Sequence, residues 1–255
     1  MTPAGHLWIV GLGPGPAHWL TPEAAQATAQ ASDLVGYAPY LDRLPPRAGQ
    51  RRHASDNRVE AERAALALGL AADGRRVALV SGGDPGVFAM AAAAFEAIER
   101  GPAAWRALGV EVAPGVSAMQ AAAARLGAPL GHDFCAISLS DNLKPWAVVA
   151  RRLAAAADGD FVIALYNPAS LARPRQIFEA FDLLRARKAA RTPVAFARAV
   201  GRADERIVVA DLGAADPGLA DMSTLVIVGS SETRWVARDE GRAWMLTPRR
   251  YGEAR

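Results

Sequence analysis

The chain has 255 residues, 51% of them hydrophobic, which is enough for a buried core in one large or two compact domains. No apolar run reaches membrane-spanning length and no signal peptide precedes the first apolar strand, so we expect a cytoplasmic protein without a membrane partner. The single cysteine excludes an internal disulfide. The four histidines lack metal-site spacing and the net charge of +3 comes without a basic run, so we expect neither a metal nor a nucleic-acid partner.

Apolar and helical segments alternate along most of the chain, which predicts an α/β fold with much parallel pairing. The last strands follow one another without a long helix, which favours an antiparallel-rich second sheet. The expected strands are 6–11, 32–36, 76–81, 110–113, 134–139, 160–166, 193–198, 205–210 and 224–229. The expected helices are 22–31, 58–72, 87–100, 117–126, 146–157 and 172–190.

Glycine and proline interrupt both periodicities at residues 127–132, so this segment is the expected linker between two domains. The predicted N-terminal domain is 1–126 and the predicted C-terminal domain is 133–255. The stretch 43–58 is rich in proline, arginine and polar residues and is predicted to be a long loop, either a solvated connection or a functional lid.

A first glycine loop follows the first strand, where residues 11–16 read Gly-Leu-Gly-Pro-Gly-Pro. Gly11 and Gly13 fit a dinucleotide fingerprint, but the third glycine position is occupied by Pro16. Proline has no N–H to offer a pyrophosphate. Thr21 is the expected N-cap of the following helix, and Pro22 suits its first position.

A second glycine loop follows the third strand, where residues 82–88 read Gly-Gly-Asp-Pro-Gly-Val-Phe. Glycines allow a ligand to approach the backbone, and Asp84 adds a carboxylate at the carboxyl edge, where open α/β sheets bind ligands. The alternative is a tight strand-to-helix turn without chemical importance, since these are ordinary turn residues.

These two loops and residues 114–119 (Pro-Gly-Val-Ser-Ala-Met), in this order, resemble the tetrapyrrole methylase family of S-adenosylmethionine-dependent methyltransferases. The resemblance extends over roughly residues 5–235. It implies the two-domain class III methyltransferase fold, with a mixed sheet flanked by helices in each domain. It also implies an active site in the interdomain cleft, a tetrapyrrole substrate and a homodimer.

The resemblance also implies the residues that bind S-adenosylmethionine and its product, S-adenosylhomocysteine. The carried-over positions are Pro14, Gly82, Gly83, Asp84, Val87, Ser117, Ala118 and Asn167, with Ala199 and Thr224 completing the adenine pocket. The chemistry of the residues supports this assignment independently at the glycines and at Asp84. Glycine lets the cofactor lie against the backbone, and a carboxylate suits its cationic sulfonium or amino group.

Two segments deliver polar residues to strand ends: 131–146 around the strand Phe134–Leu139, and 160–168, which ends in Tyr-Asn-Pro. Within the family, these segments indicate methylation of a corrin precursor coupled to ring contraction, a step of cobalamin biosynthesis. Ring contraction needs proton transfers, for which Asp141 is the first candidate and His132 the second. Either residue could instead cap the strand.

Two other classes of function remain open at this stage. One is a methylase of the same fold acting on a different tetrapyrrole, including a cobalt-loaded one, or on RNA or protein. The other is a nicotinamide-dependent dehydrogenase or a nucleotide-binding module that uses the first glycine loop, against which Pro16 argues.

Overall fold

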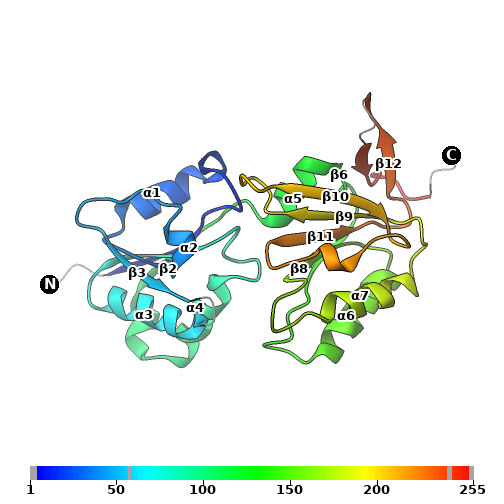
Figure 1. Cartoon of the computed structure of the whole chain (residues 1–255). Helices are drawn as coiled ribbons and strands as arrows, with labels where there is room; N and C mark the ends of the chain where they lie inside the picture. Colours follow the sequence, from blue (N-terminus) through cyan, green and yellow to red (C-terminus); the bar gives the residue numbers. More distant parts are fainter. Residues whose placement is uncertain (1–4, 57–58, 240–242, 253–255) are drawn as a thin grey trace. The chain divides into compact units, whose positions relative to one another are not determined.

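The computed structural model describes residues 5–56, 59–239 and 243–252. The chain divides into two compact units, Met1–Ala118 and Met119–Arg255. Each unit is built on a five-stranded sheet with helices packed against it, which confirms the predicted α/β class (Figure 1).

The sheet of the first unit is entirely parallel and has the order β3-β2-β4-β1-β5. All of its strands therefore end at one edge, which we call the carboxyl edge of this unit. The strands are β1 (His6–Gly11), β2 (Asp33–Tyr37), β3 (Arg51–Ser55), β4 (Arg76–Ser81) and β5 (Gly109–Ala113). The helices are α1 (Pro22–Gln30), α2 (Ala38–Leu41), α3 (Glu60–Ala72) and α4 (Met90–Arg100), with 3-10 turns η1 (Ala17–Trp19) and η2 (Ala103–Ala107).

Both faces of this sheet are buried, because alternate residues of the central strands enter two different cores. Leu7 and Ile9 of β1 pack with α3 and α4 on one face. Trp8 and Val10 pack with α1 on the other face. The helix start on that face is as predicted, since the Thr21 hydroxyl accepts a hydrogen bond from the Ala24 amide at 3.2 Å and Pro22 follows it.

The prediction of a continuous loop over 43–58 is wrong. Residues Arg51–Ser55 form β3, which pairs in parallel with β2 at the sheet edge. An edge strand is half-solvated and needs no apolar alternation, so Arg-Arg-His-Ala-Ser gave no strand signal. Residues 57–58, which include the expected first residue of the next helix, lie outside the described residues.

The sheet of the second unit is mixed and has the order β10-β9-β11-β8-β7. β7 and β8 are parallel, and the other three pairs are antiparallel, as predicted for the last strands. The strands are β7 (Phe134–Ser138), β8 (Val162–Tyr166), β9 (Pro193–Arg198), β10 (Arg206–Asp211) and β11 (Thr224–Val228). The helices are α5 (Ala118–Leu126), α6 (Trp146–Asp158) and α7 (Gln176–Arg185), with the 3-10 turn η3 (Pro217–Leu219).

Helices α6 and α7 cover one face of this sheet and share a single core with it (Figure 1). Leu153 of α6 and Phe181 of α7 are fully buried there. The ring of Phe181 stacks on Phe196 of β9 with centroids 5.7 Å apart. These contacts fix the sheet against its helices and so position the loops that leave its strands.

A small third sheet joins β6 (Gly127–Ala128), β12 (Arg234–Ala237) and β13 (Ala243–Leu246). β6 lies inside the expected linker 127–132, yet it pairs with β13, and the two units divide at Ala118–Met119 instead. The glycines of this segment allow close backbone packing: a Cβ added at Gly131 would lie 2.3 Å from the Thr247 carbonyl oxygen.

Candidate active site

Three loops meet backbone to backbone at the carboxyl edge of the first unit, after β1, β4 and β5. Gly13 and Gly83 exchange hydrogen bonds, with N···O distances of 3.1 and 3.0 Å. A Cβ added at Gly115 would lie 2.4 Å from the Gly83 carbonyl oxygen, and one added at Gly11 would lie 2.7 Å from the same atom. Glycine is therefore required at these positions by the approach of the backbones.

The carboxylate of Asp84 fastens the second loop to the third. Its Oδ1 accepts a hydrogen bond from the Gly86 amide at 2.8 Å, and its Oδ2 accepts one from the Gly115 amide at 3.0 Å. Asp84 thus has an observed role in loop positioning, beyond the charge complementarity expected from the sequence.

The first loop is held by a residue that the sequence did not indicate. The guanidinium of Arg43 donates hydrogen bonds to the carbonyl oxygens of Leu12, Gly13 and Gly15, at 2.9, 2.9 and 2.8 Å. These acceptors are close to thirty residues away in the chain, so no local pattern could have found the contact. Three converging carbonyl oxygens match the fixed fork of an arginine.

The other predicted cofactor residues of this unit line the same loops. Pro14 and Val87 are half-buried, and Ser117 is buried directly before Ala118, where the third loop ends. Gly83 has φ +71°, and an added Cβ would lie 3.9 Å from its nearest neighbours, the Ala118 amide nitrogen and the Val116 carbonyl oxygen. The missing side chain of Gly83 thus leaves room for about one methyl group beside the backbone, which lets a ligand lie close to it.

In the second unit, β7, β8 and β9 run in the same direction, so their carboxyl ends share one edge. Asn167 follows β8 and donates a hydrogen bond to the Ser138 hydroxyl at 3.0 Å. Ala199 follows β9 and is buried. The Thr224 hydroxyl, at the start of the antiparallel β11, donates to Asp221 Oδ1 at 2.7 Å. The structure therefore brings all three predicted residues of this unit to its carboxyl edge.

Three of the four described non-glycine residues with positive φ lie at these edges, and the fourth, Asp160, lies at the opposite edge of the second sheet. Phe88, Asn167 and Ala199 have φ of 52°, 50° and 48°. The left-handed region is unfavourable for most residues, although asparagine tolerates it better than phenylalanine or alanine. Strained backbone of this kind concentrates at ligand-binding sites, where surrounding contacts hold it in place.

The two candidate acid–base residues lie at opposite ends of β7. Asp141 follows the strand, and its Oδ2 accepts a hydrogen bond from Gln176 Nε2 at 2.9 Å. His132 precedes the strand, with its Nδ1 3.7 Å from Asp133 Oδ2 and its ring 5.8 Å from that of Tyr251. Only Asp141 therefore shares the edge that carries Asn167, Ala199 and Thr224.

Three further polar residues at this edge were not indicated by the sequence: Lys144, Arg173 and Gln176. Lys144 Nζ donates to the Ser140 carbonyl oxygen at 3.2 Å, and the buried Arg173 donates to the Asn167 carbonyl oxygen at 3.3 Å. Burial lowers the pKa of Lys144, and the nearby positive charges of Arg152 and Arg173 lower it further against the opposing effect of Asp141. The sequence feature that could have drawn attention to Lys144 is that it is one of only two lysines in the chain.

The opposite edge of this sheet holds a separate ion pair at Asp160. Its carboxylate lies 3.3 Å from the buried Lys188 Nζ and accepts hydrogen bonds from the Ser231 amide and the Tyr251 hydroxyl, both at 2.8 Å. Burial raises the pKa of Asp160, but these hydrogen bonds and Lys188 outweigh it, so the pKa lies below the ordinary value. These contacts anchor residues around 251 to the unit.

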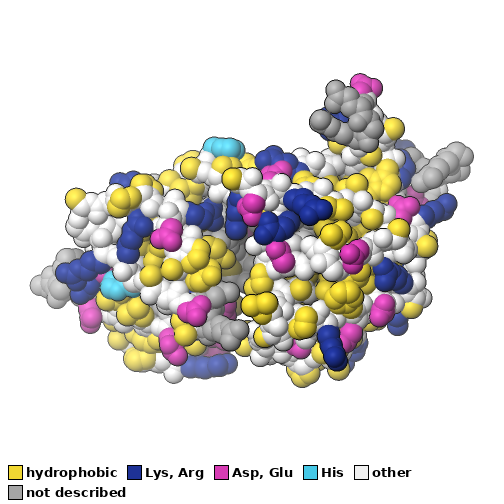
Figure 2. Space-filling model, in the orientation of Figure 1, with side chains coloured by type: hydrophobic (Ala, Val, Ile, Leu, Met, Phe, Trp, Pro, Cys, Tyr) yellow, Lys and Arg dark blue, Asp and Glu magenta, His cyan; other side chains and the backbone are white. Residues whose placement is uncertain are grey.

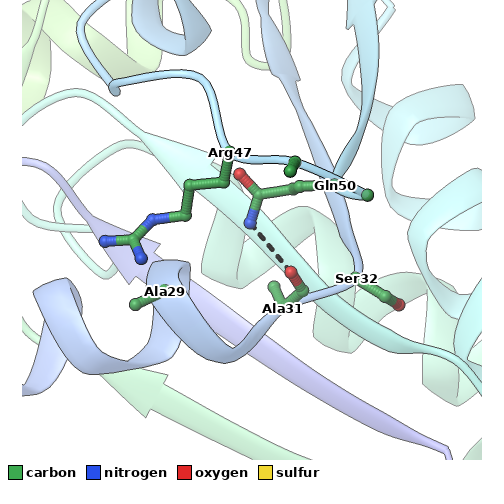
Figure 3. A pocket seen from close by; sticks show the side chains of 7 residues that line it. Ala29, Ala31, Ser32, Arg47 and Gln50 are labelled. Atoms are coloured by element: carbon green, nitrogen blue, oxygen red, sulfur yellow. Dashed lines mark hydrogen bonds between the residues drawn. The ribbon is translucent and has the colours of Figure 1, made fainter.

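A hollow of about 310 Å³ lies in the first unit at the opposite, amino edge of its sheet, between the end of α1 and the segment before β3 (Figure 3). Gln50 donates to the carbonyl oxygens of Thr28 and Ala31, both at 2.8 Å, and so satisfies the end of α1. This hollow is separated from the glycine loops by the length of the sheet.

Within the described parts of the chain, no helix is long and apolar enough to cross a membrane. The described residues also contain no group of three or more His, Cys, Asp or Glu side chains that could hold a metal ion. On the face drawn in Figure 2, basic side chains are interspersed with acidic and hydrophobic ones.

Two α/β units with glycine loops and strained residues at carboxyl edges are typical of proteins that bind ligands at the ends of their strands. Residues 6–216 match the family model of the tetrapyrrole (corrin/porphyrin) methylases. The chain belongs to this family and is a methyltransferase.

The chain is 60% identical over 250 residues to a precorrin-3B C(17)-methyltransferase of Sinorhizobium, covering 98% of both chains. It is 42% identical over 248 residues to a probable cobalt-factor III C(17)-methyltransferase of Salmonella typhimurium, covering 96% of this chain and 99% of the relative.

Among solved structures, the methyltransferase CobJ matches with a TM-score of 0.91 and 50% identity, covering 96% of this chain and 100% of that one. A uroporphyrin-III C-methyltransferase of Thermus thermophilus, complexed with S-adenosylhomocysteine, shares the fold with a TM-score of 0.65 and 23% identity. The match covers 88% of this chain and 97% of that one.

Proposed function

We propose that the chain transfers a methyl group from S-adenosylmethionine to C-17 of precorrin-3B and promotes ring contraction to precorrin-4, in cobalamin biosynthesis. The observation that carries this proposal is the 60% identity to the Sinorhizobium enzyme over nearly the whole of both chains. We further propose that the chain is cytoplasmic and acts as a homodimer; sedimentation velocity on the purified protein tests the homodimer.

The cofactor is assigned to the predicted residues at the two carboxyl edges. In the first unit these are Pro14, Gly82, Gly83, Asp84, Val87, Ser117 and Ala118; in the second they are Asn167, Ala199 and Thr224. The missing side chain at Gly83 and the strained backbone at Asn167 and Ala199 support this assignment.

S-adenosylmethionine supplies an electrophilic methyl group on a sulfonium. Methyl transfer to carbon requires the nucleophile, methyl group and sulfur in line, and positioning with exclusion of water can contribute up to about 7–11 kcal/mol. The hydrogen bonds from Arg43 and to Asp84 hold the glycine loops in one geometry, as such positioning demands. No strong base is required for this step.

Ring contraction does require proton transfer, and we assign it to Asp141. This carboxylate lies at the same edge as Asn167, and Gln176 fixes its orientation through the 2.9 Å hydrogen bond. His132 precedes β7 at the other edge, so its position gives no support to a catalytic role.

Incubation of the purified protein with precorrin-3B and S-adenosylmethionine tests the proposed function. We expect a product with the mass and absorbance spectrum of precorrin-4, and calorimetric binding of S-adenosylhomocysteine without saturable binding of NAD. Preferential turnover of cobalt-factor III would replace the substrate assignment with that of the Salmonella relative. Saturable NAD binding without any response to S-adenosylhomocysteine would contradict the cofactor assignment.

Asp141→Asn is expected to lower kcat for precorrin-3B by about 100-fold, in line with the usual contribution of a general base. Asparagine keeps the shape and can still accept a hydrogen bond from Gln176, but it cannot take up a proton. Single-turnover kinetics with product masses provides the measurement, and a methylated but uncontracted tetrapyrrole is expected to accumulate.

His132→Asn is the matched control for Asp141→Asn, because it changes a candidate at the other end of β7. We expect near wild-type turnover for this variant. Normal turnover by Asp141→Asn together with slow turnover by His132→Asn would reverse the assignment.

A further inference from the structure

Two loops at the carboxyl edge of the second unit are tied into one surface: residues 140–145, after β7, and residues 167–175, after β8. Asn167 donates to the Ser138 hydroxyl at 3.0 Å, next to the start of the first loop. Gln176, directly after the second loop, donates to Asp141 at 2.9 Å. The two loops therefore have a fixed relation to each other, and we call them together the paired loops.

Each of the paired loops presents one leucine to solvent. Leu143 is 92% exposed, and Leu171 is fully exposed at 104% of its reference area. Leu171 sits in a tight turn closed by reciprocal backbone hydrogen bonds between Ser170 and Arg173, at 3.2 and 3.0 Å. A single exposed leucine needs no explanation, but here each of two loops that are tied together presents a fully accessible apolar side chain.

Basic side chains accompany these leucines. Lys144 follows Leu143 in the first loop, and the exposed Arg175 stands in the second, whereas Arg173 is buried and donates to the Asn167 carbonyl oxygen. Arg152 of α6 is close enough to Lys144 to act on it electrostatically. The carboxylate of Asp141 is already engaged by Gln176. The surface thus combines exposed hydrocarbon with an excess of positive charge.

We propose that the paired loops form the docking surface for the tetrapyrrole substrate in the second unit, with Leu143 and Leu171 against the macrocycle and Lys144 paired with one of its carboxylates. This inference rests on the proposed function. A corrin precursor is a hydrocarbon-rich ring that carries acetate and propionate side chains, so its chemistry complements apolar contacts surrounded by Lys and Arg.

Charge selects this occupant over a second copy of the chain. An interface between copies would bring the basic side chains of the paired loops against those of the other protomer if the same surfaces met, and like charges oppose such pairing. A polyanionic ring can instead pair with the accessible basic side chains of Lys144 and Arg175. Docking here also places the substrate beside Asp141, the assigned proton acceptor.

The double variant Leu143→Ser/Leu171→Ser tests the proposal. We expect the KM for precorrin-3B to rise at least tenfold, with kcat and the calorimetric affinity for S-adenosylhomocysteine changed by less than twofold. Both side chains are exposed, so thermal unfolding is expected to match the wild type. Lys144→Gln is expected to raise the same KM and to reduce its dependence on salt concentration.

Phe134→Ser is the matched control, because Phe134 is a 44% exposed apolar residue at the opposite end of β7. We expect it to leave the KM for precorrin-3B unchanged. An unchanged KM in the double leucine variant would overturn the proposal. So would a change of sedimentation coefficient in that variant with normal KM, which would make the surface an interface between copies. Failure of the wild-type protein to turn over precorrin-3B would instead contradict the proposed function.

Discussion

Gly115→Ala is expected to weaken the binding of S-adenosylhomocysteine by more than 100-fold and to lower the free energy of unfolding by about 2–3 kcal/mol, as overpacking does. The new Cβ would lie 2.4 Å from the Gly83 carbonyl oxygen and 3.0 Å from Gly11, so the three glycine loops must separate. Separation also breaks the hydrogen bond from the Gly115 amide to Asp84. Calorimetry and urea denaturation measure the two effects.

Gly83→Ala is the matched control in the same group of loops. Its Cβ would lie 3.9 Å from the nearest protein atoms, so the free energy of unfolding should fall only by the cost of a positive φ, about 1 kcal/mol. We expect this variant to fold and to keep its loops together. Wild-type binding by Gly115→Ala would show that the close packing of these backbones does not set the cofactor site.

Asp160→Ala is expected to lower the free energy of unfolding by about 3 kcal/mol. The substitution leaves the buried Lys188 without its carboxylate and removes the acceptor for Ser231 and Tyr251. It also places alanine at φ 56°. Asp160→Asn keeps the shape and tolerates this φ, so it is expected to cost about half as much. Chemical denaturation at neutral pH measures both.

The pH dependence of these variants gives a separate check on the charge of Asp160. Because its pKa in the folded protein lies below the ordinary 3.8, ionised Asp160 contributes stability above pH 3.8, which is lost as the pH falls through the lowered value. The stability difference between wild type and Asp160→Asn should therefore be constant near neutral pH and shrink in acid. A difference independent of pH would show that shape, not charge, governs the site.

Much of the fold could be predicted where burial dictates the sequence. β1 and β4 lie in the centre of a parallel sheet, so their continuous apolar runs marked the observed bounds, His6–Gly11 and Arg76–Ser81. β3 and β12 escaped prediction because each is partly solvated and carries charged residues. Their existence depends on pairing with distant strands, which local periodicity does not report.

The candidate site likewise has features that the sequence predicted and others that it could not predict. Glycine spacing revealed the loops, because a backbone that must approach another backbone excludes every side chain. Arg43 and Gln176 could not be predicted, since their partners lie far away in the sequence and become neighbours only in the folded units. The same holds for Asp141 and His132, whose ranking required knowing which end of β7 faces the strained residues.

The pairing of β6 with β13 has a consequence for the order of folding during synthesis. The first unit has all of its strands once residue 113 has left the ribosome, because all of its pairings, which are parallel, lie within residues 6–113. In the second unit, residues 127–128 can pair only after residues 245–246 have been synthesised, and Asp160 can accept its hydrogen bond from Tyr251 only after that residue has been synthesised. Synthesis at about 5–20 residues per second therefore gives the first unit several seconds to fold before the second can close.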